Sequence, residues 1–282
     1  MAGPVPIIYN TNDYISGGSR SSSRNGGTPL HIRDILAEKT SDLYNNQTGL
    51  SLHAFSAPSQ KIHQLTQTLV EEHYNRGCPP NTHGYIFGGY CDISDKRIIQ
   101  NYWWRNRAVQ YQEVVFDYTI PEAYGKLISE ITTSARVLRR EGIRPCFATI
   151  PPASLEKWNN HQLKERKTAL LLHEGQYEAM QQRLNTVLSN VNSFICKLNV
   201  WNDMYTPYVA GTVLRTKASN DKFILSHHKM YDGVHANDKL MREWGDKFDK
   251  AIRKNRVAYR STHHPSDLNI PLTDEIVLRF GE

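Results

Sequence analysis

Short apolar runs alternate along the chain with amphipathic stretches of helical period. Apolar runs predict four buried strands, at residues 5–9, 49–55, 84–89 and 143–150. Apolar positions three or four apart predict helices near residues 30–43, 59–76, 121–142, 174–198 and 237–253, with Ser59 as the N-cap of the second. This order predicts a three-layer α/β/α fold with a central parallel sheet.

The composition of one loop, and the point where the pattern of strands and helices ends, suggest how the chain is divided. Residues 16–27 are almost entirely Ser, Gly and Arg, which predicts a flexible loop. We therefore expect residues 1–28 to supply an N-terminal strand and this loop within a single α/β domain, which spans residues 5–257. Residues 258–282 then form a C-terminal arm.

The composition excludes several classes of protein. No apolar run approaches the roughly 18–20 residues that a membrane-spanning helix needs, and the first residues do not read as a secretory signal. The four cysteines are far apart, which argues against a zinc site and against a disulfide framework. We expect an intracellular, cytoplasmic protein from a reducing compartment, with neither metal nor cofactor.

The net charge of +6 is unevenly distributed: residues 250–264 carry +5, residues 265–282 carry −3, and the other 249 residues carry +4. A basic strip with no acid among its charges is followed by an acidic end: Lys250, Arg253, Lys254, Arg256 and Arg260, then Asp267, Asp274, Glu275 and Glu282. This arrangement predicts an arm that docks on a protein partner or a second copy of the chain. Contact with nucleic acid is the weaker alternative, because the bias is local.

Asp232 and His235 form the sharpest local chemical feature. They lie three residues apart, just ahead of the last predicted helix. The aspartate can accept a hydrogen bond from one imidazole nitrogen, which leaves the other to act as a base. A plain surface turn around Gly233 is the alternative interpretation.

With this pair, the chain resembles the SGNH (GDSL-like) hydrolases, in which a D-x-x-H motif supplies the acid and base of a Ser-His-Asp triad. Residues 51–62 resemble the second family block, residues 88–93 the third block (usually G-x-N-D), and residues 142–152 the strand and diproline that often follow. The resemblance covers roughly residues 5–255. It implies an ester hydrolase fold, closest to the esterase-like domains of some viruses and mobile elements.

The chain departs from the family pattern at the nucleophile and at the oxyanion donors. If the first strand ends near Tyr9, Thr11 or Asn12 occupies the place of the nucleophilic serine, and Ser16 and Ser19 come too late unless the loop shifts. The oxyanion region maps to three residues: Ala57, Gly89 and Cys91. A thiol at Cys91 is a poor donor where the family has asparagine. Cys91 as the nucleophile is a weaker alternative.

These losses favour a degraded catalytic site in a structural or interaction protein, for example one associated with a virion or a mobile-element particle. The alternatives are an active, acetylesterase-like ester hydrolase that uses Asp232 and His235, and a nucleic-acid-associated accessory protein. A surface that mixes aromatic and basic residues would serve the interaction role: Trp103, Trp104, Arg105 and Arg107. His227 or His228 beside Asp232 as metal ligands is a minor alternative.

Overall fold

The computed structural model describes residues 7–8, 12–18, 23, 29–40, 52–56, 60–93, 95–104, 107–115, 120–165, 176–216, 223–225 and 227–258. Within them, no helix is both long enough and apolar enough to cross a membrane.

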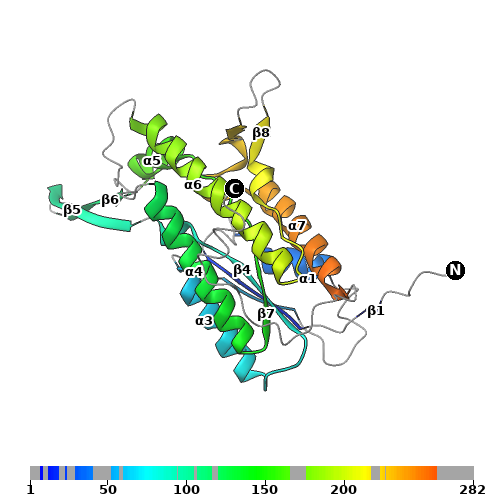
Figure 1. Ribbon diagram of the computed structural model, residues 1–282. Helices are drawn as coiled ribbons and strands as arrows, with labels where there is room; N and C mark the ends of the chain where they lie inside the picture. Colours follow the sequence, from blue (N-terminus) through cyan, green and yellow to red (C-terminus); the bar gives the residue numbers. More distant parts are fainter. Residues whose placement is uncertain are drawn as a thin grey trace.

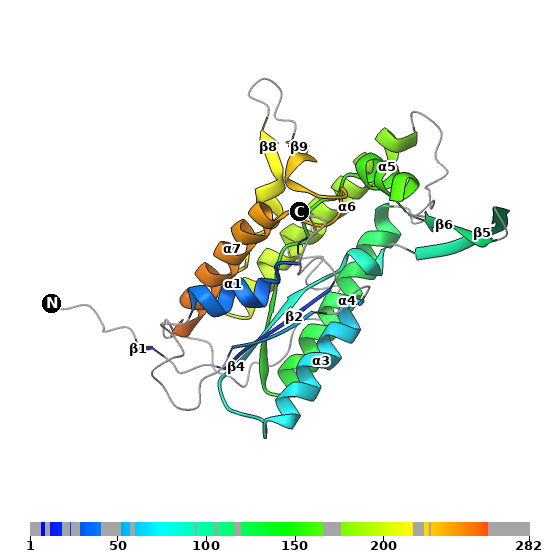
Figure 2. The same cartoon turned by 180° about the vertical axis from the view of Figure 1, so that it is seen from behind.

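A parallel sheet forms the centre of the protein (Figures 1 and 2). Its strands lie in the order β3-β2-β4-β7, with bounds Leu52–Ser56, Asn12–Gly17, Thr82–Phe87 and Ile143–Phe147. All six residues of β2 and of β4 are buried. Strands covered on both faces read as continuous apolar runs, and this explains why β4 could be recognised in the sequence.

Helices cover both faces of this sheet, which confirms the three-layer architecture (Figure 1). On one face, Tyr14 and Ile86 pack with α3 (Ile62–Asn75), α4 (Ile120–Arg140) and α6 (Gln176–Trp201). On the other face, Ile15 and Tyr85 pack with α1 (Ile32–Lys39) and α7 (Asp238–Arg256). The strand period of two sends neighbouring side chains to opposite layers.

No described strand pairs with the outer side of β7. There, and just beyond the end of the strand, two asparagines of α6 form hydrogen bonds with the backbone. Asn199 accepts a hydrogen bond from the Phe147 amide at 2.9 Å and donates one to the Phe147 carbonyl at 2.7 Å. Two helical turns earlier, Asn192 accepts a hydrogen bond from the Ile150 amide at 2.6 Å and donates one to the Ile150 carbonyl at 2.9 Å. The two side chains replace the backbone partners of a missing strand.

Among the described residues, three antiparallel strand pairs lie outside the central sheet. The longest is the hairpin of β5 (Asp95–Trp104) and β6 (Arg107–Val115), which extends away from the body in both views (Figures 1 and 2). The strands β8 (Leu214–Thr216) and β9 (Phe223–Leu225) form a second pair. The third joins β1 (Ile7–Ile8) to β10 (Val257–Ala258).

The last pair overturns one prediction from the sequence. The apolar run at residues 5–9 does not open the parallel sheet, because β1 pairs with β10, and the sheet strand is β2, which begins at Asn12. The sequence pattern also missed the β5–β6 hairpin and α5 (Leu155–Glu165). The first strand was misplaced because β2 contains Asn12, Asp13 and Ser16, polar residues that are nonetheless buried.

Candidate functional site

Four connections meet at the carboxyl edge of the sheet, where ligand sites of open α/β proteins lie. Gly18, just after β2, donates its amide hydrogen to the Phe87 carbonyl at the end of β4, at 3.1 Å. Gly89, in the connection after β4, lies against Ile62 at the start of α3 and Ile150 after β7. Gly89 has a φ of +112°, which favours glycine, and a side chain there would collide with Ile150.

Asp232 and His235 are brought together at this edge. The Nδ1 atom of His235 lies 2.6 Å from Oδ2 of Asp232. The other carboxylate oxygen, Oδ1, accepts backbone hydrogen bonds from Val234 at 3.0 Å and from His235 at 2.7 Å. Both side chains are buried. The predicted pairing is therefore present, and the carboxylate fixes the orientation of the imidazole.

Gly233 makes this turn possible and joins it to the segment after β7. Its φ is +88°, and a Cβ atom would lie 2.6 Å from the Ser154 carbonyl oxygen and 2.6 Å from the Trp158 amide nitrogen. The Gly233 carbonyl accepts a hydrogen bond from the Ser154 amide at 2.8 Å. The Asp232–His235 turn therefore packs against the first turn of α5. Val234, in the middle of this turn, belongs to the same apolar cluster as Ile150.

The Asp232 carboxylate is held in its charged form. Burial by itself would raise the pKa of Asp232, but the hydrogen bond and charge of His235, with the amides of His235 and Val234, bring that pKa below its usual range. A charged carboxylate beside Nδ1 stabilises the imidazolium that forms when the ring accepts a proton.

The structure changes the position of the first family block. Asn12 is at the start of β2, opposite Thr82 at the start of β4, and so lies at the amino edge of the sheet. Gly17 lies five positions further along the extended strand, a distance of about 16 Å, so Asn12 is at the wrong end of β2 for a nucleophile at the carboxyl edge. Thr11 precedes it and lies outside the described residues.

The strand that does reach the carboxyl edge ends at Gly17, and the chain continues as Gly18-Ser19. Ser19 is therefore the first serine after this strand in the sequence. Ser19 lies outside the described residues. The signal that could have found it is the short run Asp13 to Gly17, which reads as a buried strand once polar residues are allowed in it.

Two of the three residues predicted for the oxyanion region are described. Gly89 and Cys91 lie in or beside η2 (Tyr90–Asp92), the short 3₁₀ turn after β4. Ala57 lies outside the described residues. Asn is absent from the position of Cys91, so this edge lacks the side-chain amide donor that the family pattern has there.

Asp92, next to Cys91, connects this turn to α3. Its two carboxylate oxygens lie 3.2 and 3.3 Å from the Ile62 amide nitrogen, which donates to them at the start of the helix. The pKa of Asp92 is raised to about 6, chiefly by burial and also by nearby Glu130, against the opposing effects of the Ile62 amide, Lys61 and His63. The N-cap residue is Lys61, and the predicted Ser59 lies outside the described residues.

The remaining predicted residues are not brought to this site by any described contact. Trp103 and Trp104 end β5 and Arg107 begins β6, while Arg105 lies outside the described residues. The C-terminal arm is described only at residue 258. His227 and His228 lie in η4 (His227–Lys229), the 3₁₀ turn before the Asp232–His235 turn.

Solved structures that align with the chain carry names from the group that its motifs resemble. A GDSL-like lipase from Bacteroides thetaiotaomicron is 12% identical, with a TM-score of 0.45, over 88% of this chain and 87% of that one. The lipase/acylhydrolase from Enterococcus faecalis is 13% identical, with a TM-score of 0.46, over 89% and 99%. A lipolytic protein of the G-D-S-L family from Veillonella parvula is 10% identical, with a TM-score of 0.47, over 86% and 98%.

No protein-family model and no curated protein matches the sequence. Identities of 10–13% carry no information about activity or substrate.

Proposed function

We propose that the protein is an ester hydrolase that uses Ser19, His235 and Asp232. The observation that carries this proposal is the Asp232–His235 pair, whose Nδ1 and Oδ2 atoms lie 2.6 Å apart and which is buried beside the segment that follows β7. Ser19 comes too late in the sequence only if residues 5–9 are the first strand of the sheet. With β2 as the strand, Ser19 has the required position in the sequence.

The proposed reaction proceeds in two steps. The Ser19 hydroxyl attacks the ester carbonyl and transfers its proton to Nε2 of His235, while Nδ1 keeps its hydrogen bond to Asp232. The imidazolium then protonates the leaving alcohol, and an acyl group remains on Ser19. A water molecule gives a proton to His235 and attacks this acyl group. The acid is released, and His235 returns the proton to the Ser19 oxygen.

Cys91 sets an upper bound on the rate in this proposal. The asparagine donor of the family pattern is missing at Cys91. Removal of one such donor typically lowers the rate by about 10²–10³. We therefore expect a slow enzyme with activated esters as its best substrates.

Hydrolysis of p-nitrophenyl acetate by the purified chain tests the proposal. We expect turnover in the wild type, none above background in Ser19→Ala, and labelling of Ser19 by a fluorophosphonate probe. Ser16→Ala is the matched control: Ser16 lies within β2, buried, three residues earlier in the chain. Absence of turnover together with absence of labelling would contradict the proposal.

An interaction protein with a degraded site is the second candidate. Cys91 favours it, as does the β5–β6 hairpin, which projects from the body (Figure 2) and pairs with no further strand among the described residues. A chain without hydrolase activity, whose oligomeric state or partner binding depends on residues 95–115, would support this role.

A further inference from the structure

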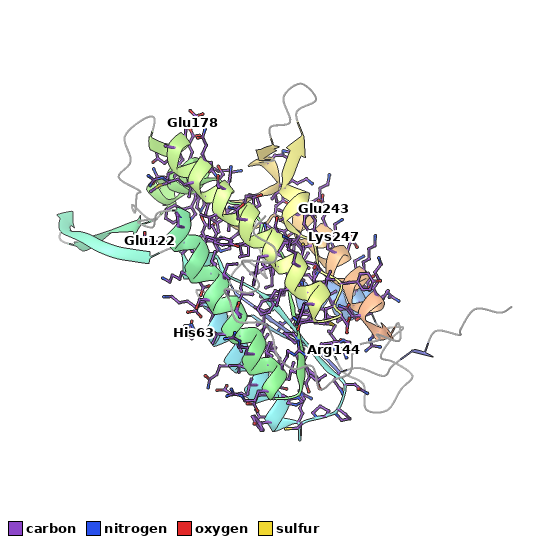
Figure 3. The ribbon with its side chains drawn as sticks, viewed as in Figure 1. His63, Glu122, Arg144, Glu178, Glu243 and Lys247 are labelled. Carbon is purple, nitrogen blue, oxygen red and sulfur yellow. The ribbon has the colours of Figure 1, made fainter. Side chains whose placement is uncertain are left out.

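A second cluster of chemical groups lies behind the oxyanion region, on the α3–α4 side of the sheet. His63 of α3, Asp92 of η2 and Glu130 of α4 each direct one nitrogen or oxygen atom into a common space, with all three atoms within 4.8 Å of one another. Figure 3 shows His63 on this side of the molecule, beside α4. The three residues come from separate parts of the sequence, so no sequence spacing could indicate the cluster.

We propose that His63, Asp92 and Glu130 form a binding site for a divalent transition metal, Zn²⁺ or Mn²⁺. One imidazole and two carboxylates suit these ions, and water would complete the coordination. Two ligand atoms that each lie about 2.1 Å from a tetrahedral ion are roughly 3.4 Å apart. Nδ1 of His63 and Oε2 of Glu130 are already 3.8 Å apart.

The different burial of the ligands supports a site that fills from solvent. Asp92 is only 1% exposed, and the Ile62 amide holds its carboxylate in place. The side chains of His63 and Glu130 are 59% and 34% exposed, so small rotations can close them on an ion. One fixed ligand and two adjustable ligands give a site that the ion can enter without unfolding of either helix.

The charges in the cluster also favour a cation. Two carboxylates lie close together, and burial of like charges is unfavourable unless a cation compensates them. Lys61 is the nearby cationic side chain on the same stretch of chain and partly compensates Asp92. A bound ion would neutralise both acids directly and would link α3, α4 and the turn that carries Cys91. The ion would thus act as a structural clamp on the oxyanion region.

Titration calorimetry of the chelator-treated full chain with Zn²⁺ tests the site, with Mn²⁺, Mg²⁺ and Ca²⁺ as parallel titrants. We expect Zn²⁺ or Mn²⁺ to bind and to raise the thermal unfolding midpoint. His63→Ala and Glu130→Gln should each weaken binding at least tenfold. Both side chains are partly exposed, so these variants should fold. His228→Ala, which removes an exposed histidine of η4, is the control and should bind as the wild type does.

Three results would overturn the proposal: no binding at millimolar metal, equal affinity in wild type and His63→Ala, or binding of Mg²⁺ and Ca²⁺ in preference to Zn²⁺ and Mn²⁺. Asp92→Asn is not the primary test, because it also removes the acceptor at the start of α3. Binding and unfolding are measured without substrate, so this site can fail while the proposed hydrolase stands, and the reverse.

Discussion

Two buried Asp–His pairs lie at opposite edges of the same sheet. At the carboxyl edge, Asp232 and His235 are 2.6 Å apart. At the amino edge, Oδ1 of Asp13 lies 3.3 Å from Nδ1 of His83, and Oδ2 lies 3.1 Å from both Nε and Nη2 of Arg256. The residue types are the same, but the surroundings of the carboxylates differ.

The difference lies in what neutralises each aspartate. The Asp13 carboxylate is neutralised by the guanidinium of Arg256, a permanent cation at the end of α7. Backbone amides and the imidazole itself hold the Asp232 carboxylate, so its negative charge remains available to an imidazolium. The first arrangement fastens α7 to β2, whereas the second can stabilise a proton on histidine. The pairs should therefore respond in opposite ways to mutation.

Loss of each histidine should give the largest contrast. In the proposed hydrolase, His235→Ala should lower kcat by roughly 10⁶-fold, because the base is lost. His83→Ala should keep the activity of the folded protein and lower the unfolding midpoint. Ester hydrolysis and thermal unfolding of both variants measure the two effects. Equal activity in the two variants would contradict the contrast.

Asp232→Asn should lower kcat by about 10⁴-fold, because the amide favours the wrong tautomer of His235. KM for p-nitrophenyl acetate should change little, since Asp232 acts through His235 rather than on the substrate. Steady-state kinetics separate the two constants. A large rise in KM with kcat preserved would show that Asp232 has a different role.

Arg256→Ala should leave the Asp13 charge buried without its guanidinium partner. Loss of one partner of a buried ion pair costs about 3–5 kcal/mol of unfolding free energy. Urea unfolding measures this loss, with Arg253→Ala, which removes a more exposed ion pair of the same helix, as the control. A loss below 1 kcal/mol for Arg256→Ala would mean that water or other groups compensate Asp13.

Cys91→Asn should restore the missing amide donor at the carboxyl edge and raise kcat by up to about 10²-fold. Cys196→Asn, in α6, is a control for cysteine removal far from η2 in the sequence. If Cys91→Asn leaves the rate unchanged, the turn after β4 does not contact the oxyanion.

The smallest expected effect is the change with pH in the stability that Asp232 contributes. The folded-state pKa of Asp232 is lowered, so its contribution to stability is complete above its unfolded pKa of about 3.9 and is lost as the pH falls toward the folded value. The stability advantage of the wild type over Asp232→Asn should be constant near neutral pH and shrink below about pH 4. Urea unfolding at several pH values measures it, and an advantage that grows in acid would contradict the assignment.

Local sequence was sufficient wherever one element buries one regular face. The helices near residues 121–142 and 237–253 and the strand at residues 84–89 were predicted because their apolar residues follow the period of the element. The Asp232–His235 pair was predicted for a related reason: both residues lie in one tight turn, so their contact depends on the local backbone alone.

The first strand shows where local sequence fails. Residues 7–8 are more apolar than Asn12, Asp13 and Ser16, yet the latter form the sheet strand, because Arg256, 243 residues away, compensates the buried Asp13. The start of α3 is a second case, since the Ile62 amide is bonded to Asp92, which lies in another loop.

By itself, the sequence determined the α/β architecture, most of its helices and the contact between Asp232 and His235, since periodicity and short-range turns act within a few residues. Only the tertiary structure decided which strand joins the parallel sheet, namely β2 rather than residues 5–9. It alone brought His63, Asp92 and Glu130 together. The physical reason is the same in both cases: buried polar groups are stabilised by partners distant in the sequence, and no local pattern records such partners.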